Sequence, residues 1–219
     1  MARFFLEKAA AEGKAEAQRK LGAIQMRQAS SIQQAEAAVE LLALAAQSGD
    51  RHAHRLLCTL VLPLEGSDDD AKSGIDQVAR EDPGLAVRLQ LSRNFGLTKL
   101  EALTVNPADG IRPWGLLVGR NPFITQCRRA APRAVPARSE AIMDNLRRAA
   151  DFFDRGSPGL RLEGDLRRRS AEQRRAFERH RLDEAVFFAS ATSSTLESLR
   201  QGPKWAFRAR DCLRGALAD

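Results

Sequence analysis

A spacing of 36 residues recurs within the first sixty residues of this 219-residue chain. Small and apolar residues occupy the same places in both copies, and each copy has a glycine at the same offset. The matching residues are Ala2, Phe5, Ala9, Ala10, Gly13, Ala17 and Leu21, and then Ala38, Leu41, Ala45, Ala46, Gly49, Ala53 and Leu57. A fixed period of this length is typical of stacked helical hairpins, which bury a continuous core by packing against their neighbours. The spacing therefore predicts an α-solenoid, and a binding module rather than an enzyme.

Each copy divides into two helices at its glycine. We expect helices over 2–12, 14–29, 34–48 and 51–62. Gly13 and Gly49 stand where a helix can end in the left-handed conformation that glycine adopts without a steric penalty. Ala9 and Ala17 are small at the place where the two helices of a hairpin should cross, which lets the helix axes approach closely.

The residues of the first copy also form a motif. Phe5, Lys8-Ala9-Ala10, Gly13, Ala17-Gln18 and Leu21-Gly22 follow one another in this order. The order resembles the SEL-one-like repeat, a relative of the tetratricopeptide repeat. The second copy departs from the motif at Leu44, His54 and Cys58. A degenerate third unit is expected around Val78, Ala79, Asp82 and Ala86, with Asp82 in the place of the glycine. The resemblance covers residues 2–62, or 2–90 with the third unit.

The resemblance implies both a fold and a kind of function. SEL-one-like proteins are non-enzymatic α-solenoids that scaffold protein complexes, and in bacteria they include exported proteins, signalling adaptors and immunity proteins. We therefore expect a bacterial protein–protein interaction module, in its most specific form an immunity protein that neutralises a toxin. The expected partner is another protein, such as a secreted toxin or lipase effector. It would bind in the groove of the inner helices or on the basic C-terminal half.

The remainder of the chain departs from a plain repeat array. We expect helices over 70–81, 84–94, 98–104, 139–155, 165–190 and 204–217, and one that begins at the capping box of Ser194 and Glu197. Five prolines between residues 106 and 137 forbid long helices there, and residues 114–118 should form a short extended segment packed on the solenoid. The predicted organisation is all-α, with an αα-hairpin solenoid over 1–105, an irregular connection over 106–137 and a C-terminal helical subdomain over 138–219.

The net charge of +7 is concentrated in one part of the chain. Residues 120–181 hold 16 arginines and no lysine against 8 acidic residues, whereas the flanking parts are close to neutral. The candidate partner-binding residues are Arg167, Arg168, Arg169, Arg174, Arg175 and Arg179, together with Trp114. A basic surface suits an acidic protein, a nucleic acid or an anionic lipid, but a solvated helix with ion pairs one turn apart has the same composition. The alternative function is thus a sequence-independent nucleic-acid or anionic-surface binder that uses residues 161–181. Nucleic acid is the less favoured partner, because aromatic residues for base stacking are scarce.

No set of residues has the spacing of a known reaction centre. The GxSxG, Walker A, HExxH and Gly-rich dinucleotide motifs are absent. His54 and Cys58 are four residues apart, as a thiol–imidazole pair requires, but Cys58 occupies the place of Gly22 and is predicted to be a buried packing residue. The aspartates 68–70 lack the EF-hand spacing and predict a solvated turn, and His180 is expected to be exposed. We expect no catalytic residue, no cofactor and no metal site.

The compartment is left open. Three cysteines without CxxC spacing predict neither a disulfide framework nor a zinc site. The longest apolar stretches are too short for a membrane span. No signal peptide is visible and the chain starts inside a repeat helix, so we expect a preceding N-terminal part, with or without an export signal. The protein would be cytoplasmic, or periplasmic if that part contains the signal.

Overall fold

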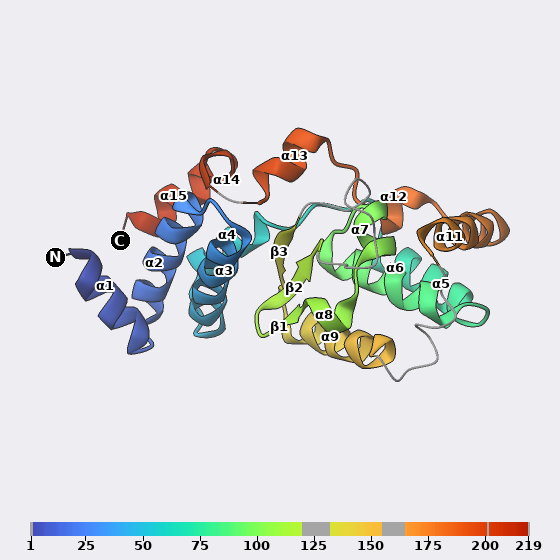
Figure 1. Ribbon diagram of the computed structural model, residues 1–219, viewed down its shortest axis with the longest axis horizontal. Coiled ribbons are helices and arrows are strands. Elements are labelled where there is room, and N and C mark those ends of the chain that lie inside the picture. The colour runs from blue at the N-terminus through green and yellow to red at the C-terminus, as the bar shows by residue number, and fades with distance from the viewer. Residues whose placement is uncertain (1, 120–131, 155–164, 201, 219) are drawn as a thin grey trace.

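The computed structural model describes residues 2–119, 132–154, 165–200 and 202–218. Fourteen helices and three short strands make up the regular structure of these ranges, so the chain is mostly helical, which is consistent with the predicted all-α class. The molecule is elongated, and both chain ends lie at the same tip (Figure 1).

The two copies of the repeat fold as two consecutive helical hairpins. The hairpins consist of α1 (Ala2–Ala11) with α2 (Ala15–Gln28), and α3 (Ile32–Gln47) with α4 (Arg51–Cys58). Gly13 and Gly49 have φ angles of 82° and 89°, as predicted. In both turns the amide that follows the glycine donates to a carbonyl oxygen five residues earlier, from Lys14 to Ala9 and from Asp50 to Ala45. These bonds define the same Schellman turn in both copies.

Because the two turns have the same geometry, replacing either glycine by alanine should lower the free energy of unfolding by the same amount. Gly13→Ala and Gly49→Ala each place a Cβ atom in open space, because no other atom lies within 4 Å of that position. The loss of unfolding free energy should therefore be that of the left-handed backbone alone, about 1 kcal/mol in each variant. Gly22→Ala should cost more, since its Cβ would lie 3.0 Å from the Ala38 carbonyl oxygen. Urea unfolding measures all three, and clearly unequal losses at Gly13 and Gly49 would contradict the equivalence of the turns.

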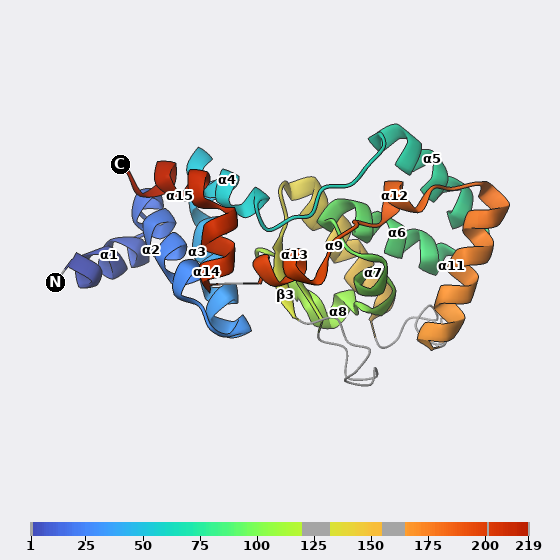
Figure 2. The same cartoon turned by 90° about the horizontal axis from the view of Figure 1, so that it is seen from above.

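The end of the chain completes the core of the hairpins. The last two helices, α14 (Gly202–Arg208) and α15 (Arg210–Leu217), pack against α2 and α4 (Figure 2). Trp205 is fully buried, and its indole Nε1 donates to Thr59 Oγ1 at 3.0 Å. Residues 138–219 are therefore not one subdomain as predicted, because the chain returns to its beginning after residue 200.

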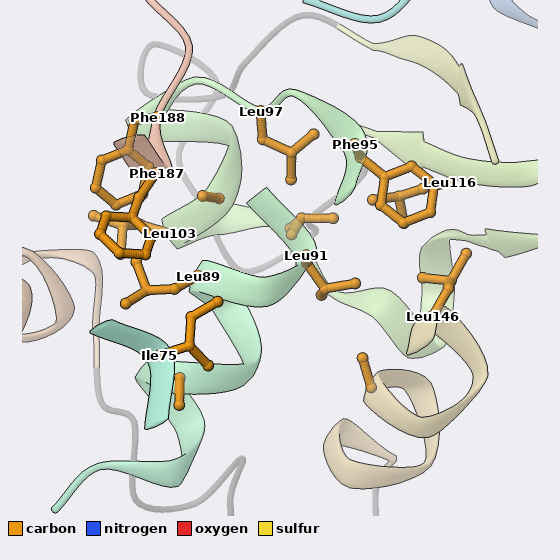
Figure 3. Packing of buried hydrophobic residues seen from close by; sticks show 14 of the residues in the cluster. Ile75, Leu89, Leu91, Phe95, Leu97, Leu103, Leu116, Leu146, Phe187 and Phe188 are labelled. Carbon is orange, nitrogen blue, oxygen red and sulfur yellow. The ribbon is translucent and has the colours of Figure 1, made fainter. Parts of the chain in front are cut away.

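A second, larger core lies at the other end of the molecule (Figure 3). Its helices are α5 (Asp68–Ala79), α6 (Pro83–Phe95), α7 (Lys99–Thr104), α9 (Glu140–Phe153), α11 (Leu166–His180) and α12 (Glu184–Phe187). The predicted third repeat unit falls on the α5–α6 hairpin, which packs in this core with α11 and α12. Asp82 has a φ of −137°, and its side chain caps α6 by accepting from the Leu85 amide. The hairpin thus lacks the glycine turn of the first two.

Several helix boundaries differ from the expected ones. The helix predicted over 51–62 ends at Cys58, and the helix predicted over 204–217 is divided at Ala209 into α14 and α15. The helix predicted over 165–190 ends at Arg181, a non-glycine residue with a φ of 52° that caps α11. The next predicted helix, α13 (Ser193–Ser198), is capped by Thr192 rather than by Ser194. The aspartates 68–70, predicted as a solvated turn, are exposed but form the first turn of α5, where acidic side chains stabilise a helix.

A three-stranded antiparallel sheet joins the two cores. Its strands are β1 (Ile111–Arg112), β2 (Gly115–Val118) and β3 (Arg133–Pro136), in the order β1-β2-β3, and α8 (Pro107–Gly110) precedes them. Leu117 and Ala134 belong to the core of the hairpins, whereas Leu116 and Val135 belong to the larger core. The extended segment predicted at 114–118 thus contains β2, but the described part of 106–137 forms α8 and the three strands rather than an irregular connection.

A buried ion pair ties the sheet to the helices. Arg133 Nε and Nη2 donate to the Glu101 carboxylate at 2.7 and 3.0 Å, and the side chains are only 1% and 2% exposed. Arg133 also donates to the carbonyl oxygens of Leu60 and Gly96. Burial acts to raise the pKa of Glu101, but Arg133 and the Thr98 hydrogen bonds outweigh it and hold this pKa below its usual value.

Candidate functional site

The six candidate arginines lie on α11 and differ in their surroundings. Arg168 Nε donates to a glutamate one turn later at 2.8 Å, and Arg179 pairs with Glu81 of the α5–α6 turn. Arg169 is half-buried and donates to the Leu103 carbonyl oxygen at 2.7 Å. The arginines that are exposed and have no ion pair or hydrogen bond to another described residue are Arg167, Arg174 and Arg175. About half of the predicted cationic surface is therefore already engaged within the protein.

A hollow of about 190 Å³ lies between α11 and the end of α5. Its lining has three acidic side chains, Glu81, Asp82 and Glu172, against the two arginines Arg175 and Arg179, together with His180. His180 is half-buried rather than exposed as predicted, and its Nε2 lies 3.5 Å from Glu81 Oε1. The hollow therefore does not concentrate positive charge for an anionic partner.

Trp114, the remaining candidate residue, does not present its ring to solvent. It lies in the turn between β1 and β2, is only 4% exposed and packs in the core of the hairpins. Trp114 therefore cannot offer its whole ring to a partner, as an exposed tryptophan in a surface loop would. Part of the residue does line a groove on the surface of the protein.

The groove has a volume of about 300 Å³ and lies between the second hairpin and the start of α9. Its buried or half-buried lining is apolar and consists of Ala43, Ala46, Leu57, Trp114, Ala137 and Met143. The exposed lining consists of Gln47, His54, Pro113, Arg138, Ser139, Glu140 and Arg147. An apolar floor within a polar rim is the usual composition of a site that binds a protein or an organic ligand.

The charges of the rim are partly neutralised. Arg147 Nη1 lies 2.6 Å from carboxylate oxygens of Glu140 and Asp144, and these hydrogen bonds raise the pKa of Arg147 above its usual value. Arg138 is exposed, and no described carboxylate lies within ion-pair distance of it. The rim therefore has one positive charge, that of Arg138, without a described ion-pair partner above the apolar floor.

His54 and Cys58 form a pair beside the groove. Their Nε2 and Sγ atoms are 3.6 Å apart. Cys58 is exposed, so the prediction that it is buried is wrong, because α5, the helix that follows α4, packs in the larger core and does not stack on α4 as α3 stacks on α2. Partial burial of the sulfur atom raises the pKa of Cys58, although Arg138 opposes this effect. The thiol is therefore protonated at neutral pH and is not an activated nucleophile.

The groove of the second hairpin is equivalent to a filled cleft of the first. Ala46, His54 and Leu57 line the groove, and they follow Ala10, Gln18 and Leu21 by 36 residues. The equivalent cleft of the first hairpin is filled by Leu41 of α3, which packs against the cluster that contains Leu21. The residue 36 positions after Leu41 is Gln77, an exposed residue of α5, and α5 packs in the larger core rather than on the second hairpin. The chain therefore leaves the second cleft without the side chain that the repeat would supply.

Sequence reasoning named Trp114 but missed the other residues of the groove, although the period contained a signal for one of its walls. The register that pairs Leu57 with Leu21 marks the cleft of the second hairpin. The opposite wall comes from Pro113, Trp114 and the start of α9, and only the folded structure brings these segments to the hairpin.

No protein-family model, no curated protein and no solved structure matches this chain. The resemblance to SEL-one-like repeats therefore stays a prediction that rests on the residues of the two hairpins. Among the described helices, none is long and apolar enough to cross a membrane. The described residues also contain no group of three or more His, Cys, Asp or Glu side chains that could hold a metal ion.

Proposed function

We propose that this protein is a non-catalytic protein-interaction module that binds an α-helix of a partner in the groove between the second hairpin and α9. The observation that carries the proposal is the equivalence of this groove to the first cleft, which the chain fills with Leu41 of an α-helix. The bound helix would present one large apolar side chain to the buried floor, as amphipathic helices do in hydrophobic grooves. Neutralisation of a toxin is the narrower form of this proposal, and it comes from the repeat resemblance alone.

The arginine-rich helix supports the alternative function less well. A binder of nucleic acid or an anionic surface needs several free cations on one face. Three of the six arginines of α11 are instead engaged by a carboxylate or a carbonyl oxygen of the protein. The unengaged ones, Arg167, Arg174 and Arg175, serve as a control surface in the experiment below.

The test uses a fluorescently labelled peptide with the sequence of α3, residues 32–47. Anisotropy should show micromolar to millimolar binding to the intact protein, because a free helix of this length is only marginally formed in water. A peptide with Leu41→Ala should bind about tenfold more weakly or worse, as expected for the loss of an interface anchor. The protein variant Ala46→Phe, which fills the groove with its own ring, should lose binding.

The control protein carries Arg167→Gln, Arg174→Gln and Arg175→Gln and should bind the peptide as the unaltered protein does. Binding that survives Ala46→Phe would place the site elsewhere and contradict the proposal. Loss of binding in the glutamine control would favour the arginine-rich surface. Absence of any binding would reject the groove as a helix-binding site.

A further inference from the structure

A side chain that fits the groove is exposed at the opposite end of the repeat pair. Phe5 stands 36 residues before Leu41, on the same face of its helix, and is 63% exposed. Phe4 beside it is 65% exposed, and the two rings are in edge contact at 5.8 Å. Adjacent exposed aromatic rings of this size mark an interaction site on a protein surface.

The equivalent helices α1 and α3 differ in what covers this face. The face of α3 that contains Leu41 packs on the preceding hairpin, over Gly22 of α2. The corresponding face of α1 contains the exposed Phe5, and α1 packs chiefly on α2 (Figure 1). The chain thus has an unfilled cleft at the end of the second hairpin and an unburied cleft-filling residue at the start of the first.

We propose that α1 of a second copy of this chain binds at the groove and inserts Phe5, as Leu41 inserts into the first cleft. This inference rests on the proposed function and names its partner. Each copy offers one Phe5 and one groove on different surfaces, so the contact is heterologous, and it joins copies head to tail into rows or closed rings.

The proposed contact differs from the packing of α3 on the first hairpin in two residues, and their effects on the distance between the helices offset each other. Cys58 replaces Gly22, where even a Cβ atom would meet α3 at 3.0 Å, so an incoming helix must lie farther from α4. Phe5 extends farther from its helix than Leu41 and reaches across the wider gap. The groove volume of about 300 Å³ is enough for one aromatic side chain of a helix bound at its mouth, and Trp114 in its wall offers an aromatic contact.

The test is complementation between two variants, followed by sedimentation velocity on the intact chain. The unaltered protein should associate above its 24.1 kDa monomer mass as its concentration rises. Phe5→Glu and Ala46→Phe should each weaken self-association about thirtyfold or more, the effect of losing a central interface residue. An equimolar mixture of the two should form a heterodimer that does not grow further, because only one intact Phe5 and one intact groove can meet.

Two further variants serve as a control and as a second test of the groove. Phe207→Glu removes an equally prominent ring, 80% exposed on α14, and should leave association unchanged. His54→Trp narrows the groove from an exposed position and should repeat the effect of Ala46→Phe if that variant is unstable. A protein that stays monomeric up to about 1 mM would overturn the proposal. If the α3 peptide still binds that monomer through the groove, the proposed function stands and the occupant is a helix of another protein. If neither association nor peptide binding occurs, both proposals fail.

Discussion

Replacing Glu101 by glutamine should lower the unfolding free energy by about 3–5 kcal/mol, because it leaves the buried Arg133 guanidinium without its counter-charge. Glutamate and glutamine side chains are of nearly equal size, so packing is little changed. The loss reports on the charge and on the hydrogen bonds that the second carboxylate oxygen accepts from Arg133 and Thr98. Arg133 is held by β3 and also contacts the ends of α4 and α6, which prevents it from turning towards water. Chemical denaturation measures the loss. The control Glu140→Gln breaks an exposed pair with Arg147 and should cost less than about 1 kcal/mol. Equal losses in the two variants would contradict the structural role of the buried pair.

The same pair should make stability depend on pH. The pKa of Glu101 is lower in the folded protein than the ordinary glutamate value of about 4.3, so the folded state favours the ionised form. Its contribution is therefore fully present above the ordinary pKa and is lost as the pH falls below that value towards the folded pKa. Thermal unfolding between pH 7 and pH 3 should show a smaller decline in melting temperature for Glu101→Gln than for the unaltered protein. Parallel declines would show that Glu101 is not the group that titrates.

The local features of the hairpins could be predicted because they are encoded within a few residues. A glycine two residues past a helix end favours the Schellman turn, and the 36-residue period places such a glycine at both Gly13 and Gly49. The third unit differs for an equally local reason. Asp82 does not favour the left-handed conformation at the place of the glycine, and it caps the next helix instead.

The long-range features could not be predicted, because no local pattern encodes them. The strands are only two to four residues long, and both faces of β2 and β3 are buried, so they lack the alternation that marks a strand. The return of α14 and α15 to the hairpins depends on the contact between Trp205 and Thr59, which are 146 residues apart in the sequence. The burial of Trp114 and the exposure of Cys58 follow from these placements. For the same reason, only one wall of the groove could be predicted from the period.

Trp205→Ala should lower the unfolding free energy by about 3–5 kcal/mol, the usual effect of removing a fully buried aromatic side chain. Removal of the indole would leave a cavity between α14 and the hairpins, where few other large side chains hold the last two helices. We therefore expect amide exchange in α15 to rise more than exchange in α6, which belongs to the other core. Trp205→Phe keeps most of the apolar contact and loses the Nε1 hydrogen bond to Thr59, so it should cost less than the alanine variant. Uniformly faster exchange in both cores would show instead that the two cores unfold as one unit and that the return of the chain is not a separable element.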